Sequence, residues 1–179
     1  YLLSELLDQQ PIDIVVFLLK TALLPRFCAP LCEHIVVHDK DERPARACIE
    51  WLERTNFLIV ALDDQHGWHR YHHLVQEFLV SRATAMFGLD QINALHRQAA
   101  DWFAQEGLTE EALHHALAAQ DFERAAKLME QGLCAVLNRQ DLATLRRWSN
   151  LLPVDFRRKR PGLLMIEAWV LYFSVQLGK

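Results

Sequence analysis

The spacing of apolar residues changes once along this chain, and that change constrains the fold more than any other feature. Before residue 57, apolar residues recur at helical intervals and predict three helices, at residues 12–24, 30–37 and 44–54. A compact apolar run then leads into the polar turn at residues 63–67, after which large and polar residues alternate from Trp68 to His72. Two short strands about a turn of this kind predict a β-hairpin with a five-residue loop.

Helical spacing returns at residues 74–87, so three helices, a two-stranded wing and a further helix follow one another. That order is typical of a winged-helix domain, which we place at residues 1–88. Residues 89–179 are helical throughout, and Gly107 and Pro153 end two of the helices. Alanine-rich stripes and short connections favour antiparallel neighbours. The predicted fold class is mainly α: a winged-helix domain with one small β-hairpin, followed by a tetratricopeptide-like antiparallel helical array.

The distribution of charge argues against DNA binding by the winged helix. The formal net charge is −4, whereas a nucleic-acid-binding domain usually carries a basic face. From Lys40 to Arg54, around the third predicted helix, four basic residues are balanced by four acidic ones, and a helix that reads DNA draws affinity from cations beside phosphates. We find no apolar run of the ~18 residues that a membrane span needs and no secretory signal, so we expect a cytoplasmic protein without a membrane partner.

Residue clusters that could carry chemistry are few. The histidines at positions 66, 69, 72 and 73 are close in sequence, but alternate strand residues face opposite sides, so His69 and His73 would share a face that His72 does not. The cysteines lie in apolar helical patterns, and we expect buried thiols with no metal site and no disulfide at Cys28, Cys32, Cys48 and Cys134. Neither a Gly-x-Ser-x-Gly elbow nor a G-x-x-x-x-G-K-[ST] phosphate loop occurs, so we expect neither catalysis nor a bound cofactor in this chain.

One run of residues resembles a known family. Arg70-Tyr71-His72-His73-Leu74-Val75-Gln76-Glu77-Phe78-Leu79 is similar to the winged helix of the STAND signal-transducing ATPases, in particular the MalT-like subfamily of LuxR-type regulators. Shorter matching runs include Phe17-Leu18-Leu19-Lys20-Thr21 and Ala116-Leu117-Ala118-Ala119-Gln120-Asp121-Phe122. The resemblance implies an internal piece of an ATP-dependent transcription regulator. A P-loop domain that binds ATP or ADP would precede it, and the rest of a helical sensor and a C-terminal DNA-binding domain would follow.

The same resemblance implies partners and a site. The chain would contact its own ATPase domain and the remaining helical sensor, which binds a small-molecule or protein effector; DNA would be bound only by the C-terminal domain. In the family's inhibited state a winged-helix histidine lies close to the β-phosphate of ADP, and in plant and animal relatives it belongs to a Met-His-Asp motif followed by Leu. The matching positions are Tyr71-His72-His73-Leu74, so His72 would be the ADP sensor and His73 replaces the aspartate.

Two alternatives stay open at this point. His72 could instead pack beneath the wing or bond a backbone carbonyl, with no role in sensing. The chain could also be a helical adaptor that binds a protein partner and has no nucleotide switch.

The second half contains three further features. The basic run Arg157-Arg158-Lys159-Arg160 predicts a solvated loop. Residues 163–177 are apolar on nearly all sides, which is typical of a helix that another helix covers, so we expect the chain to be a piece of a longer protein. Trp102, Trp148 and Trp169 are candidates either to line a ligand groove or to pack in the core.

Overall fold

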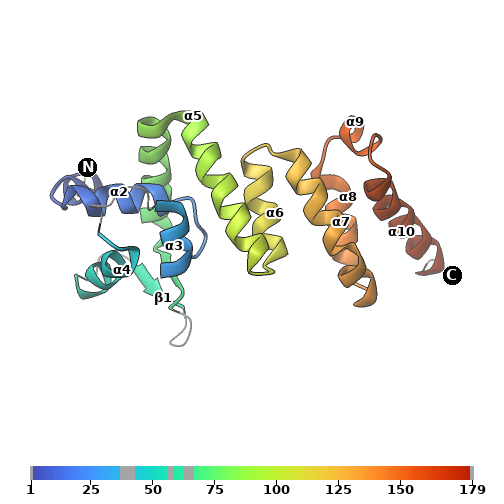
Figure 1. Cartoon of the computed structure of the whole chain (residues 1–179), viewed down its shortest axis with the longest axis horizontal. Coiled ribbons are helices and arrows are strands. Elements are labelled where there is room, and N and C mark those ends of the chain that lie inside the picture. Colours follow the sequence, from blue (N-terminus) through green and yellow to red (C-terminus); the bar gives the residue numbers. More distant parts are fainter. Residues whose placement is uncertain (1, 37–42, 56–58, 63–66, 178–179) are drawn as a thin grey trace. The chain divides into compact units, whose positions relative to one another are not determined.

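The computed structural model describes residues 2–36, 43–55, 59–62 and 67–177. The chain divides into two compact units, Tyr1–Trp102 and Phe103–Lys179, and Figure 1 shows the helices that make up each of them. The fold is mainly α with a single two-stranded sheet among the described residues, as predicted. Within the described ranges, no helix has both the length and the apolar character needed to cross a membrane.

The first unit contains the predicted helices and hairpin, together with one helix that the sequence did not predict, Leu2–Asp8. Its elements are α1 (Leu2–Asp8), α2 (Ile12–Thr21), α3 (Ala29–Val36), α4 (Ala45–Arg54), β1 (Ile59–Ala61), β2 (His69–Tyr71) and α5 (His73–Gln105), of which the last crosses into the second unit. Gly88 has φ 74° and ψ 168° and kinks α5, so the two helices predicted on either side of it are continuous except at that residue.

The strands pair as an antiparallel hairpin, with Ile59 opposite Tyr71 and Ala61 opposite His69. The predicted turn lies largely outside the described residues, except for Gly67, whose φ of 63° favours glycine. Strand geometry ends at Tyr71, because the next residues turn into α5. The expectation that His69 and His73 share one strand face is therefore wrong: His69 and Tyr71 form the buried face, and His73 is the first residue of a helix.

Phe27 forms the centre of this unit, in a segment for which the sequence predicted no pairing. Its backbone forms a bridge with His69, through two reciprocal N–H···O bonds of 2.8 Å. Its fully buried ring lies 4.7 Å from that of Tyr71, 5.9 Å from that of His69 and 6.5 Å from that of Phe17, measured between centroids. Phe27 thereby attaches the hairpin to the helical core.

The second unit is a succession of helices packed on their neighbours. Its remaining elements are α6 (Thr109–Ala118), α7 (Phe122–Asn138), α8 (Leu142–Leu151), α9 (Val154–Arg157) and α10 (Pro161–Leu177). Helix α7 contacts α6 and α8, and α10 contacts α7 and α8. Small side chains lie at these contacts, and Ala112, Ala116, Ala125 and Ala126 are completely buried. Their size lets the helix axes approach closely.

The same turn joins three pairs of successive helices. A residue with positive φ ends each helix, namely Gly107, Gln120 and Gln140, with φ of 73°, 56° and 54°. The N–H of the next residue then bonds the carbonyl five positions back, as Leu108 to Phe103, Asp121 to Ala116 and Asp141 to Val136. This is the Schellman arrangement, which satisfies the last carbonyls of a helix. The residue that closes each turn also begins the next helix.

The structure corrects two expectations in this unit. Arg157 forms an ion pair with Glu167 at 3.0 Å, and Arg160 pairs with Glu123 and Glu130, so the basic run is not simply a solvated loop. Both arginine side chains are largely covered, at 14% and 23% exposure. Cys134 is exposed rather than buried, whereas the thiols of Cys28, Cys32 and Cys48 are buried as predicted.

We predict that the cap of α8 gives this unit a pH-dependent stability. The Asp141 carboxylate accepts hydrogen bonds from the N–H and the hydroxyl of Thr144, which lower the pKa of Asp141. The contribution of the Asp141 carboxylate to the free energy of unfolding is therefore complete above the ordinary carboxyl pKa of about 4. It is lost as the pH falls through the lower folded-state pKa. The free energy of unfolding, measured in urea, should be lower for Asp141→Ala than for the original chain at neutral pH. The two values should converge in acid.

Leu108→Ala is the matched control, because it changes the equivalent turn residue without removing a carboxylate. A difference between Asp141→Ala and the original chain that is equally large at every pH would contradict the assignment of the cap.

Candidate functional site

His72 lies at the junction between β2 and α5. Its carbonyl accepts hydrogen bonds of 2.9 Å from the N–H groups of both Val75 and Gln76, so His72 occupies the capping position of the helix. The first N–H groups of any helix have no intrahelical partner and carry the positive end of its dipole. The side chain of His72 is exposed at this end. His72 therefore lies both at a strand–helix junction and at a helix N-terminus.

The residues on either side of His72 are fixed to the end of α2. Thr21 donates its hydroxyl proton to the carbonyl of Phe17 at 2.7 Å, so the hydroxyl of Tyr71 donates to Thr21 Oγ1 across 2.6 Å. Burial raises the pKa of Tyr71 well above its ordinary value, which keeps this donor neutral.

On the other side, the amide nitrogen of Gln76 donates to the carbonyls of Ala22 and Leu24, at 3.1 and 2.9 Å. Two buried or half-buried anchors thus hold the backbone of an exposed histidine.

His69 has a structural environment. It is 5% exposed and its ring stacks on Phe27. Its Nδ1 lies 2.8 Å from the carbonyl of Gly67 and its Nε2 lies 2.8 Å from Glu53 Oε1. Both ring nitrogens face oxygen acceptors, so both hydrogen bonds form with the ring as donor only in the imidazolium form. These contacts join the base of the hairpin to α4.

His73 has different neighbours from His69. Its Nε2 lies 3.3 Å from Glu77 Oε1 one helical turn later, and its side chain is 74% exposed. A shallow cavity of about 260 Å³ lies beside it, lined by His73, Gln76, Glu77, Ala22 and His96 among others. Among the described residues, no group of three His, Cys, Asp or Glu side chains could hold a metal ion. His66, the remaining histidine of the predicted cluster, lies outside the described residues.

Helix α4 occupies the position of a DNA-reading helix, and its charged side chains contact neighbouring protein groups. Arg43, which lies before α4, pairs with Asp13 at 3.0 Å, and within α4 Arg46 pairs with Glu50 at 3.3 Å. Glu53 is held by His69. The opposite side of α4 is core, with Cys48, Ile49 and Leu52 buried among others. These pairs extend the balance of charge found in the sequence; Lys40, Asp41 and Glu42 lie outside the described residues.

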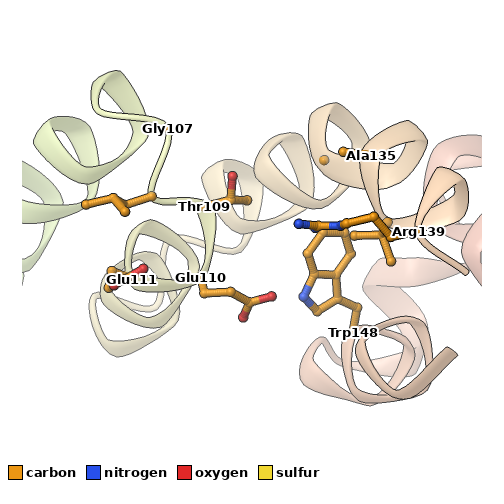
Figure 2. Close-up of a pocket in the computed structure, with 10 residues that line it drawn as sticks. Gly107, Thr109, Glu110, Glu111, Ala135, Arg139 and Trp148 are labelled. Atoms are coloured by element: carbon orange, nitrogen blue, oxygen red, sulfur yellow. The ribbon is translucent and has the colours of Figure 1, made fainter. Parts of the chain in front are cut away.

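The three candidate tryptophans have different surroundings. Trp102 packs edge-on against Trp68 within the first unit, with 6.1 Å between ring centroids. Trp148 is buried and lines a cavity of about 250 Å³ where α6 begins, which Figure 2 shows. Trp169 stacks on Phe173 and lines a small apolar depression on α10. The sequence did not indicate the polar residues around Trp148, because they come from the start of α6 and from the end of α7, which are separate in the chain.

The helices α2 to α4, the hairpin and the first part of α5 define a winged-helix domain. Residues 3–90 match the MalT winged helix domain, and this part of the chain belongs to that family. Over 171 residues, 96% of this chain, the sequence is 29% identical to the HTH-type transcriptional regulator MalT of Klebsiella pneumoniae (strain 342). The chain spans 18% of the length of that relative. The MalT-like family that the sequence indicated is thus confirmed.

We predict that His69 and His72 differ sharply in their effect on folding. His69→Ala removes a buried stacked ring and two hydrogen bonds, and should lower the free energy of unfolding by about 3 kcal/mol. His72→Ala leaves the capping carbonyl in place and should change the free energy of unfolding by less than about 0.5 kcal/mol. Chemical unfolding of both variants measures the difference, and equal losses would contradict the separation into a structural and an exposed histidine.

Proposed function

We propose that this chain is a regulatory, non-catalytic segment of an ATP-dependent transcription regulator, in which His72 senses the nucleotide bound by a neighbouring ATPase domain. The observation that carries the proposal is the exposed side chain of His72 at a helix N-terminus, between the anchors Tyr71 and Gln76. Family membership of the winged helix and similarity to a transcriptional regulator over 96% of the chain support it.

The chemistry of this position suits a phosphate. The open N–H groups of the first turn of α5 and the helix dipole favour an anion there. A charge-assisted hydrogen bond from His72 would add about 1.5–3 kcal/mol. If that bond forms only in the ADP-bound closed state, its loss would shift the balance between closed and open states by about 10- to 150-fold.

The surface around His72 suits contact with a second domain. Leu74 is 62% exposed at the start of α5, directly after two exposed histidines. Where relatives with a Met-His-Asp motif have an aspartate, this chain has His73, whose ring contacts the Glu77 carboxylate instead. We infer that Glu77 supplies the negative charge one turn further along the helix, and that His73 is not the sensor.

The second unit fits a tetratricopeptide-like arm that begins a helical effector sensor. Its repeated turn geometry and its small residues at helix contacts are the features that let helix pairs stack one after another. In this proposal ATP or ADP is bound by the ATPase domain and not by this chain, which has no phosphate-binding loop. DNA is bound by a separate C-terminal domain, and the effector is a small molecule or a protein.

The direct test is transcription by the longer protein that contains this chain. His72→Ala should raise transcription in the absence of effector by about tenfold or more, because the closed state loses its contact with ADP. His73→Ala is the matched control, since it changes an adjacent exposed histidine at the same helix end, and it should leave basal transcription near the original level. Unchanged basal activity of His72→Ala would overturn the sensor assignment.

A further inference from the structure

The three repeated turns of the second unit differ in one chemically important residue. Leu108, Asp121 and Asp141 close these turns with nearly the same backbone conformation, with φ and ψ of −87° and 69°, −85° and 73°, and −81° and 78°. Asp121 and Asp141 each accept a hydrogen bond of 3.0 Å from an N–H group of the first turn that follows. Leu108 has no acceptor, and α6 begins without a side-chain cap.

A cavity borders the uncapped start of α6. Its volume is about 250 Å³, and Leu108, Thr109, Glu110 and Glu111 line it from the first turn of α6. The N–H groups of that first turn have no intrahelical partner. Ala135 and Val136 provide an apolar wall from α7, and Figure 2 shows Arg139 extending from the end of that helix toward Trp148.

A second, independent donor faces the same cavity. Trp148 is 2% exposed, yet its indole Nε1 has no hydrogen-bond partner within the described structure. Figure 2 shows the indole nitrogen on the side of the ring where Glu110 lies. Gly132 lets the ring occupy this place, because a Cβ there would lie 2.8 Å from Trp148 Cη2. A buried N–H without an acceptor is costly, so a ligand that offers an oxygen would be stabilised.

The side-chain charges around the cavity are nearly balanced, so the dipole of α6 determines which ligand charge is favoured. Glu110 is paired with Arg147, so its charge is largely neutralised. Arg139 and Glu111 also line the cavity and carry opposite charges. The positive end of α6 and the neutral donors of Trp148 and Thr109 then favour an acceptor with negative charge.

We propose that this cavity binds a small free carboxylate with an apolar body, whose carboxylate replaces the absent Asp cap of α6 and accepts from Trp148 Nε1. The apolar body lies against Leu108, Ala135 and Val136. The cavity volume limits the ligand to about the size of an acylated amino acid. The site stands apart from the nucleotide-sensing role of His72 and does not depend on it.

The test uses the full chain and a matched pair of probes, N-acetyl-L-leucine and its amide. The indole N–H signal of Trp148 in ¹H–¹⁵N spectra, assigned with Trp148→Phe, reports binding directly. The acid should shift this signal saturably with a dissociation constant in the range of about 0.1–10 mM. The amide, which keeps the body and lacks the negative charge, should bind at least tenfold more weakly.

Two variants at one position make the result specific. Leu108→Asp supplies an internal cap of the kind present at Asp121 and Asp141, so it should keep the fold and weaken binding of the acid at least tenfold. Leu108→Ala leaves the N–H groups open and should retain binding within about threefold, since it removes only part of the apolar wall. No saturable shift with the acid, equal binding of acid and amide, or unchanged binding by Leu108→Asp would each overturn the proposal.

Discussion

The reciprocal backbone hydrogen bonds between Phe27 and His69 determine how the winged helix is assembled. They attach the hairpin to the segment between α2 and α3, and they place the rings of His69 and Tyr71 on Phe27. With β2 held there, the Tyr71 hydroxyl reaches Thr21 and Gln76 reaches the carbonyls at the end of α2. The strand–helix junction is therefore connected to the core on both sides of His72, whose side chain is exposed. A fixed backbone favours a sensor, because little conformational entropy is lost on contact with a ligand.

The sequence predicted most of the elements, because helical periodicity and the polar turn are local signals. Apart from α1, the helices of the first unit, the hairpin and the end of helical spacing just before Gly88 were apparent from spacing. The pairing of Phe27 with His69 was missed. Phe27 lies in the short segment between Pro25 and Pro30, and one isolated bridge leaves no periodic pattern in the sequence. The strand was expected to persist past Tyr71, because alternation of residue types cannot show where hydrogen bonding gives way to a helix. The partly covered arginines at positions 157 and 160 were missed for a related reason, since their carboxylate partners lie on α7 and α10.

The two candidate sites were accessible from sequence to different degrees. His72 came from resemblance to a family motif, and no spacing argument alone would have chosen it among the neighbouring histidines. The cavity beside Trp148 needed the structure, because its donors come from the start of α6, the end of α7 and the middle of α8. One local signal was present: the chain reads Gln120-Asp121 and Gln140-Asp141 at two turns, and Gly107-Leu108 at the third. Only the common geometry of the three turns shows that leucine stands at a capping position.

We propose that His72 recognises a phosphate arrangement specific to ADP from a pre-positioned helix terminus. The most direct measurement is the affinity of the longer protein for ADP and for ATP, determined by calorimetry with the original residue and with His72→Ala. In His72→Ala, ADP binding should weaken by about tenfold or more, while ATP binding should change by less than about threefold. Equal ADP affinity in the two proteins, or an equal loss for both nucleotides, would contradict it.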